Sequence, residues 1–241
     1  MNYNFSKKWV NLGILFGVPF LFILIFGNHV ESTSVKHNYN PLDIISENIV
    51  ELDSLFFLDN NITNLEDNIT ILCFVGDKPM NKVIGSLNLK QLVYDKFKGF
   101  KFNKKKFQII TISLKGSEDQ IKLLRSELLK YDKLEYWFFA TASLDNYKMI
   151  YNSLLDGHNL DSFSATDNVF IVDESKNQRG RINDNEKEDS INDENIGLFS
   201  YNTISVSEVK NKMNDDIRIL FTEYRDRRKG EFNRKINILN N

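Results

Sequence analysis

The sequence predicts an α/β domain built on a mixed β-sheet and preceded by one apolar segment. Short apolar runs alternate with amphipathic stretches of helical period, which is the order expected when helices connect parallel strands. A later pair of β-type runs around a turn indicates an antiparallel hairpin. Before all of these, the 17 residues from Val10 to Phe26 carry no charge, which is typical of a membrane span.

Composition allows one good core and argues against nucleic acid as a partner. Of the 241 residues, 41% are hydrophobic, which is enough to bury one domain. Lys and Arg number 31 against 33 Asp and Glu, so the net charge is −2 and no basic field attracts phosphates. The single cysteine cannot form a disulfide within the chain, so the core must hold the fold.

The amino-terminal segment is predicted to be a single-pass membrane anchor. Lys7 and Lys8 precede it, Trp9 lies at its edge and Glu31 follows it, so residues 9–30 can cross a hydrocarbon core of about 30 Å with the amino terminus in the cytoplasm. Everything after it is then extracytoplasmic, or periplasmic in a bacterium. A cleaved signal peptide is the alternative, but no Ala-x-Ala-like site follows the apolar run.

The chain divides into four predicted parts. Residues 1–30 are the cytoplasmic end and anchor, and residues 31–48, rich in Ser, Thr and Asn without periodicity, are a spacer. Residues 49–229 contain the α/β domain. Residues 230–241 are a flexible tail.

The first core strand and the turn after it are the centre of the predicted domain. Ile69–Val75 is apolar almost throughout, as in a strand buried on both faces, and residues 49–61 predict a short strand or hairpin before it. The crevice beyond such a strand is the usual place for a site in an open α/β sheet. The residues there are Gly76, Asp77, Lys78, Pro79 and Met80.

Helix and strand then alternate. Leucines and phenylalanines at helical spacing predict a helix over Ser86–Gly99, with Ser86 or Asn88 as its cap. Phe107–Leu114 is rich in β-branched residues and predicts a strand. The spacing of Ile121, Leu124 and Leu128 predicts the next helix. Ser117 can cap this helix, which ends near Tyr131.

The second half of the domain continues in the same way. The aromatic run Leu134–Thr141 predicts a strand, and Ser143–Leu155 is a helix capped by Ser143. Asn168–Asp173 and Arg179–Ile182 predict a hairpin around residues 174–178, and an acidic, solvated loop over residues 183–195 follows. The last helix is predicted from Ser205, with Ser205 or Ser207 as cap, to about Lys229.

This order of elements resembles the thioredoxin-like superfamily, and within it the membrane-tethered Sco/SenC copper chaperones. The resemblance covers residues 49–229 and rests on Ile69–Gly76, on Phe107–Leu114 with its helix, and above all on Asn168–Arg181. It implies a thioredoxin-like mixed sheet flanked by helices.

The metal and redox motif of that family does not carry over. Sco-type proteins hold copper with a Cys-x-x-x-Cys pair after the first core strand and a histidine before the late strand. Here residues 76–80 contain no cysteine, and the histidine position falls near Ala165 or Thr166. Met80 alone cannot supply a copper(I) site. We therefore expect no cofactor and interpret residues 76–80 as a vacated redox corner.

Three other candidates have both a functional and a structural interpretation. Cys73 is either a reactive thiol or a small core residue, and its place inside a strand favours the core. His158 is a candidate metal ligand, alone or with the acidic loop, although a single histidine in a polar loop is more often a surface residue. Arg179 and Arg181 either order the hairpin through surface ion pairs or face a partner.

These observations favour a membrane-tethered, extracytoplasmic thioredoxin-like domain that lacks the redox motif and acts on an unidentified protein partner. An accessory role in assembling an envelope or respiratory complex fits this prediction. No catalytic constellation is recognisable in the sequence. The alternative is a thiol-dependent oxidoreductase or peroxidase that uses Cys73.

Overall fold

The structure, a computed structural model, describes residues 12–18, 39–58, 63–102, 105–156, 159–184 and 197–230. The chain divides into two units, residues 1–39 and residues 40–241. In the first unit, residues 12–18 are helical. No helix within the described ranges is long and apolar enough to cross a membrane. The predicted span lies outside those ranges except for residues 12–18, so it stays a prediction.

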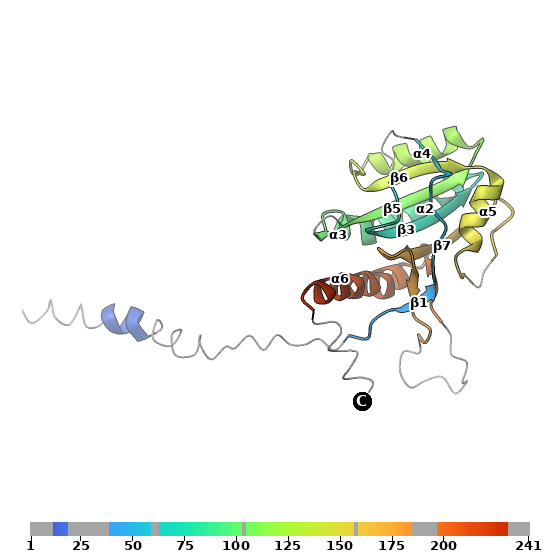
Figure 1. The fold of residues 1–241 in the computed structure, drawn as a ribbon. Helices are drawn as coiled ribbons and strands as arrows, with labels where there is room; N and C mark the ends of the chain where they lie inside the picture. The colour runs from blue at the N-terminus through green and yellow to red at the C-terminus, as the bar shows by residue number, and fades with distance from the viewer. Residues whose placement is uncertain are drawn as a thin grey trace, which may run out of the picture. The chain divides into compact units, whose positions relative to one another are not determined.

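The second unit is built on one mixed sheet (Figure 1). Its strands in the described part of the chain are β1 (Asp43–Ser46), β2 (Phe56–Phe57), β3 (Asn68–Gly76), β4 (Lys101–Phe102), β5 (Lys105–Leu114), β6 (Trp137–Ala142), β7 (Ala165–Val172), β8 (Gln178–Gly180) and β9 (Tyr201–Asn202). The order across the sheet is β1-β8-β7-β3-β5-β6-β2, with β4 paired to β5 and β9 to β7. Strands β3, β5 and β6 are parallel, while β7 and β8 run antiparallel to their neighbours.

Helical segments connect and cover these strands. They are η1, a 3₁₀ turn (Pro79–Lys82), α2 (Val83–Leu89), η2, a π-helical turn (Lys90–Tyr94), α3 (Asp95–Phe97), α4 (Glu118–Leu129), α5 (Leu144–Asn152), η3, a second π-helical turn (Glu208–Met213), and α6 (Asn214–Arg228). The segments from η1 to α3 run without a break, and so do η3 and α6.

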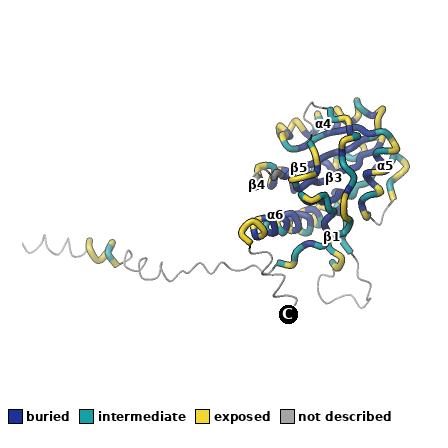
Figure 2. The backbone as a smooth tube through the Cα atoms, in the orientation of Figure 1, coloured by how far each residue is buried: buried dark blue, intermediate teal, exposed yellow. Residues whose placement is uncertain are grey.

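Strand β3 forms the middle of the core because both of its faces are apolar. Ile71 and Cys73 belong to one cluster, which also contains buried residues of η2, α4 and α6. Leu72 and Phe74 belong to the other, which contains the buried side of α5 and residues from the segment before β3. Figure 2 shows β3 and β5 as buried. Burying a Phe or Leu side chain stabilises the fold by about 1.5–3 kcal/mol, so this alternation fixes which helices cover which face.

The arrangement is a mixed α/β sheet flanked by helices, as the sequence predicted. Parallel β3 and β5 lie beside antiparallel β7 and β8, and helices follow β3, β5 and β8. In the chain, β6 and α5 come between β5 and β7. In the sheet, β6 lies beside β5. Because β3, β5 and β6 are parallel, their carboxyl ends meet at one edge of the sheet.

The predicted boundaries need three corrections. Strand β1 pairs antiparallel with β8, so residues 43–46 belong to the sheet and the spacer ends before residue 48. The first helix begins at Pro79 rather than at Ser86 and continues through α2, because proline suits a first helical position. Ser86 therefore lies inside α2 and caps nothing.

Other predicted features agree with the structure. Ser143 caps α5 by accepting a hydrogen bond from the backbone N–H of Asn146 at 3.3 Å. The hairpin of β7 and β8 forms, and the last helix runs to Arg228. Of the two predicted caps for that helix, Ser205 accepts a hydrogen bond from the N–H of Glu208 at 3.4 Å.

Candidate functional site at the end of β3

The turn that ends β3 packs directly against the backbone of the loop before β7. Gly76 has a φ of 62°, and a Cβ at this position would lie 1.9 Å from the carbonyl oxygen of Phe163. The N–H of Asp77 donates to the same carbonyl at 3.0 Å. Only glycine fits here, for both steric and conformational reasons. The predicted corner is therefore in contact with the loop before β7, next to the position near Ala165 or Thr166 that the resemblance to Sco-type proteins assigns to their histidine.

Tyr147 of α5 forms hydrogen bonds with the backbone of both loops. Its hydroxyl accepts a hydrogen bond from the N–H of Gly76 at 3.1 Å and donates one to the carbonyl of Ser164 at 2.6 Å. The side chain is fully buried, and burial raises the pKa of Tyr147 well above its usual range despite the hydrogen bond from Gly76. The hydroxyl therefore stays protonated and works as a donor and an acceptor at once.

Lys82, the last residue of η1, forms ion pairs with the loop before β7 and with β7 itself. The ammonium of Lys82 lies 3.3 Å from an Asp161 carboxylate oxygen and 3.2 Å from one of Asp167, with its side chain only 13% exposed. The other Asp161 oxygen accepts hydrogen bonds from the N–H groups of Phe163 and Ala165, each at 2.9 Å. One ammonium group therefore links two carboxylates, and this cluster of Lys82, Asp161 and Asp167 is called the clamp below.

The carboxylate of Asp161 is favoured in its charged form. Partial burial raises its pKa, but the two backbone donors and the Lys82 ammonium outweigh burial, and the net pKa lies below its usual value. The loop before β7 is therefore shaped around an ionised Asp161.

The outer side of the corner exposes little reactive chemistry. The ammonium of Lys78 lies 3.9 Å from the centroid of the Phe163 ring, a cation–π contact that again joins the two loops. Asp77 and Lys78 are exposed, Met80 is half-buried and Pro79 is buried. None of these side chains is a nucleophile with a base beside it.

Cys73 lies three residues before the corner, inside β3. Its side chain is 7% exposed and packs in the core cluster below α6 and η2. Burial raises the pKa of its thiol to about 12, although a hydrogen bond with Thr111 lowers it slightly. A thiol in this environment is protonated and shielded at neutral pH, which favours the core interpretation over the reactive one.

The donors near the corner do not fit the copper of Sco-type proteins. Copper(I) prefers thiolate and thioether ligands. The corner supplies one thioether, Met80, with carboxylates of Asp161 and Asp167 that an ammonium already holds. Across the described residues, no group of three or more His, Cys, Asp or Glu side chains is arranged to bind a metal ion. We therefore derive no step through copper.

Arg179 lies in the interior, and the expectation of a surface pair or a partner contact is wrong for this residue. Its side chain is 3% exposed and donates to Asp173 at 3.0 Å and to Glu223 of α6 at 2.9 Å. It also donates to the carbonyl of Leu42 at 2.6 Å, while the N–H of Leu42 donates to Glu223 at 2.9 Å. This network ties the start of the sheet to α6.

Arg181 forms a second internal network. Its guanidinium binds Asp216 of α6 at 2.7 Å and Asp184 at 2.9 Å, and Asp216 also accepts a hydrogen bond from Tyr201 at 2.5 Å. Asp184 is bound by Lys212 as well, so the first acidic residue of the predicted loop is not solvated as expected. Both hairpin arginines thus order the fold through buried partners.

Some predicted residues cannot be placed, and some functional ones were missed. His158 and residues 185–196 lie outside the described residues. The clamp residues Lys82, Asp161 and Asp167, and the buried Tyr147, were not predicted, because no local pattern relates Lys82 to partners 79 and 85 positions away. The only available signal was the glycine of the corner itself.

Comparisons with known proteins found similar solved structures but no related sequence family. No family model matches the chain, and no curated protein matches it significantly. Solved structures similar to it include yeast Sco1 (10% identity, 72% of this chain and 95% of that one, TM-score 0.41) and Arabidopsis thaliana ScoI with copper bound (14%, 72% and 98%, 0.39). The thioredoxin domain of a thiol-disulfide oxidoreductase from Bacteroides vulgatus is another (14%, 56% and 86%, 0.36). The strand order defines the fold of this chain. The chain is similar to thioredoxin-like and Sco proteins.

Proposed function

We propose that this chain is a membrane-tethered, extracytoplasmic thioredoxin-like domain that has no redox chemistry and acts by binding a protein. The setting we propose is the assembly of an envelope or respiratory complex. The observation that carries the proposal is the closure of the corner. Tyr147 and Lys82 hold the turn after β3 against the loop before β7, and the one cysteine lies buried behind it.

Apolar side chains beside the corner support protein contact. Ile84 of α2 is 63% exposed, and Ile204 and Val206 are 48% and 49% exposed. Ile204 borders α2, because a Cβ at Gly85 would lie 3.6 Å from its terminal methyl carbon. Exposed apolar side chains next to a rigid loop favour contact with a protein.

The tether is supported by the sequence of the amino-terminal end. The uncharged residues 10–26 behind Lys7 and Lys8 match a single span with a cytoplasmic amino terminus. In the folded unit, Arg179 and Glu223 bind the backbone of Leu42, which fixes the point where the chain enters the sheet. Alkaline extraction of membranes tests this part, because a spanning segment resists it and a cleaved one leaves the domain soluble.

Photo-crosslinking in membranes tests the protein contact. A photoreactive amino acid at Ile84 should capture a defined neighbour under ultraviolet light. The same amino acid at Leu155, which is 48% exposed but belongs to the loop after α5, is the matched control. Equal capture at both positions, or none at Ile84, contradicts a partner at the corner.

Turnover and metal assays test the absence of redox chemistry. The purified chain should not accelerate reduction of insulin by dithiothreitol and should not bind copper(I) stoichiometrically at micromolar concentration. Catalysed reduction that is lost in Cys73→Ala would assign the alternative, a thiol oxidoreductase. Stoichiometric copper would assign a chaperone function in spite of the donor set.

A further inference from the structure

Two basic segments meet at one end of the folded unit. Residues 96–106, which run from α3 through β4 into β5, contain six lysines, three phenylalanines and no acidic residue. Residues 225–229, at the end of α6, contain four basic residues and one acidic residue. We call the described residues of these two segments the basic face. Although the whole chain has a net charge of −2, its positive charge is concentrated here.

The two segments of the basic face contact each other through phenylalanine rings. The ring centroid of Phe221 in α6 lies 5.9 Å from that of Phe97 and 4.9 Å from that of Phe100. Figure 1 shows α3 next to the carboxyl-terminal end of α6. Arg225 follows Phe221 by one helical turn, so both residues lie on the same side of α6. The basic face is therefore one continuous surface.

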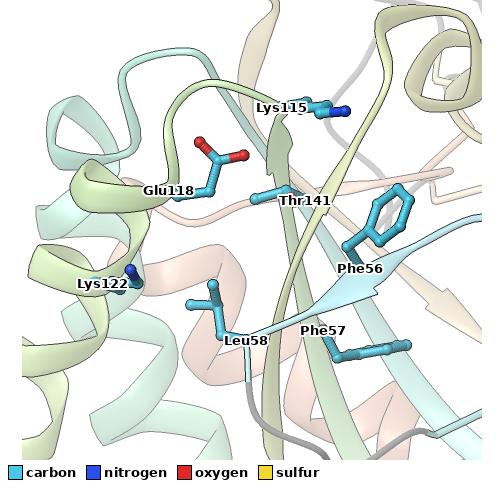
Figure 3. A pocket seen from close by; sticks show the side chains of 7 residues that line it. All are labelled: Phe56, Phe57, Leu58, Lys115, Glu118, Lys122 and Thr141. Carbon is cyan, nitrogen blue, oxygen red and sulfur yellow. The ribbon is translucent and has the colours of Figure 1, made fainter.

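The basic face and the corner lie at opposite ends of the sheet. The corner follows Gly76, the last residue of β3, whereas β4 pairs with the first two residues of β5, which is parallel to β3. Strands of this length separate the two ends by about 30 Å. At the corner end, the groove lined in part by Lys115, Glu118 and Lys122 mixes charges of both signs (Figure 3). It offers no field comparable to that of the basic face.

An aromatic ring and cations are exposed together on the basic face. Phe100 is 51% exposed although its ring packs on Phe221. Lys96 is exposed and has no ion pair with a described residue. The side chain of Arg225 is 52% exposed and pairs loosely, at 3.5 Å, with the buried Asp226. This combination suits an anionic bilayer surface, where aromatic rings enter the interface and each cation contributes about 1 kcal/mol.

The acidic residues at this end are fewer than the basic ones. Asp95 and Asp132 both bind Lys98, so that lysine is the one whose charge is neutralised. The exposed acidic residues beside the basic face, within the described ranges, are Glu66 and Asp67 before β3 and Glu135 before β6. The surface therefore keeps an excess of positive charge, which favours an anionic partner.

The chain enters the folded unit against the helix that carries half of the basic face. The N–H of Leu42 donates to Glu223 of α6 at 2.9 Å, two residues before Arg225. The eleven residues 31–41 can span at most about 40 Å, so they keep this helix close to the anchor proposed for residues 9–30. A tether of this length raises the effective concentration of the bilayer surface, so a weak attraction is enough for docking.

We propose that the basic face docks on the surface of the bilayer in which the chain is anchored, by binding anionic phospholipid headgroups. The ring of Phe100 enters the interfacial region, and the cations of both segments contact lipid phosphates. This inference rests on the proposed membrane tether and adds an orientation to it. The corner, at the other end of the sheet, points away from the bilayer, where a protein partner can reach Ile84.

Fluorescence quenching on the full chain, reconstituted in vesicles that contain a lipid with a nitroxide headgroup, tests the inference. One fluorophore is attached to Gly99→Cys, where a new side chain meets nothing within 4 Å, and in a second sample to Lys115→Cys, after the end of β5. In phosphatidylcholine with about 30% phosphatidylglycerol, the label at residue 99 should be quenched at least about threefold more. Pure phosphatidylcholine, or about 0.5 M salt, should remove most of this difference.

Variants identify the residues responsible. Lys96→Glu combined with Arg225→Glu should reduce the quenching at residue 99 by about half or more, and so should Phe100→Ala. Lys115→Glu combined with Lys122→Glu makes the same change in charge at the other end of the sheet. This matched control should leave the quenching at residue 99 unchanged.

Several results would overturn the inference. They are equal quenching at residues 99 and 115, quenching at residue 99 that does not depend on lipid charge, or equal effects of the two pairs of charge reversals. Loss of quenching on addition of polyglutamate, with no effect of lipid charge, would assign an acidic protein to this surface instead. If the chain resists alkaline extraction and the two labels are quenched equally, only this inference fails. If the chain is extracted, the tether on which it rests fails as well.

Discussion

Tyr147 donates a hydrogen bond from its hydroxyl to the carbonyl oxygen of Ser164 at 2.6 Å, and the same hydroxyl accepts the N–H of Gly76 at 3.1 Å. One buried side chain therefore satisfies two backbone groups from segments far apart in the chain. The turn after β3 and the loop before β7 cannot separate without leaving at least one of these groups unpaired. This relationship makes the corner a rigid surface.

Tyr147→Phe should destabilise the domain by about 1–3 kcal/mol, because it removes both hydrogen bonds while keeping the ring in place. Urea unfolding followed by the fluorescence of the buried Trp137 measures the change. The control is Tyr131→Phe at an exposed position, which should change the free energy of unfolding by less than about 0.5 kcal/mol. Equal effects of the two substitutions would mean that the hydroxyl of Tyr147 does not hold the corner.

Gly76→Ala should destabilise the domain more than Gly116→Ala does. Both glycines have positive φ, 62° and 99°, so both substitutions strain the backbone by about 1–2 kcal/mol. Only at Gly76 does the new Cβ meet another atom, the Phe163 carbonyl oxygen at 1.9 Å, whereas nothing lies within 4 Å at Gly116. The difference between the two unfolding free energies therefore isolates the close approach of the loops, and no difference would contradict it.

Arg179→Met should cost about 3–5 kcal/mol, because it leaves the buried carboxylates of Asp173 and Glu223 without their shared cation. Arg218→Met removes an exposed arginine that pairs with Asp215 at 2.9 Å, and it should cost only about 0–1 kcal/mol. Thermal or urea unfolding compares the two variants. A small change in the free energy of unfolding for Arg179→Met would instead favour the surface role that the sequence predicts.

Protonation of Asp161 at low pH should destabilise the contact between the turn after β3 and the loop before β7. Folding lowers the pKa of Asp161 below its usual 3.8, so its carboxylate stabilises the fold above that pH, and the contribution is lost as the pH falls through the folded-state value. In Asp161→Asn this titration is absent. The difference in unfolding free energy between the native chain and the variant should stay constant between about pH 5 and 7 and narrow below about pH 4. A difference that widens on acidification would mean that folding raises the pKa of Asp161 instead of lowering it.

The sequence predicts the elements whose evidence is local. Ile69–Val75 and Phe107–Leu114 are continuous apolar runs, and the structure places β3 and β5 over them. Strand β1 was missed because its four residues form a strand only by pairing with β8, far along the chain. The start of the first helix was missed although Pro79 marks it.

The sequence predicts where the central strand ends, but not the contacts around the turn that follows it. The position of the corner follows from the end of a central strand, a rule of topology. Its closure depends on Lys82 meeting Asp161 and Asp167 and on Tyr147 meeting Ser164, contacts that only the folded chain creates. For the same reason Arg179 was expected at the surface, since Glu223 lies 44 residues away in sequence.

Labelling of the native chain with a thiol-reactive probe tests the central claim most directly, because any thiol chemistry must use the only cysteine, Cys73. Burial raises the pKa of its thiol to about 12 and covers the sulfur. We predict that Cys73 stays unlabelled at about pH 8 for as long as the fold persists and reacts at once in denaturant. Rapid stoichiometric labelling of the folded chain would contradict the account and favour a thiol-dependent enzyme.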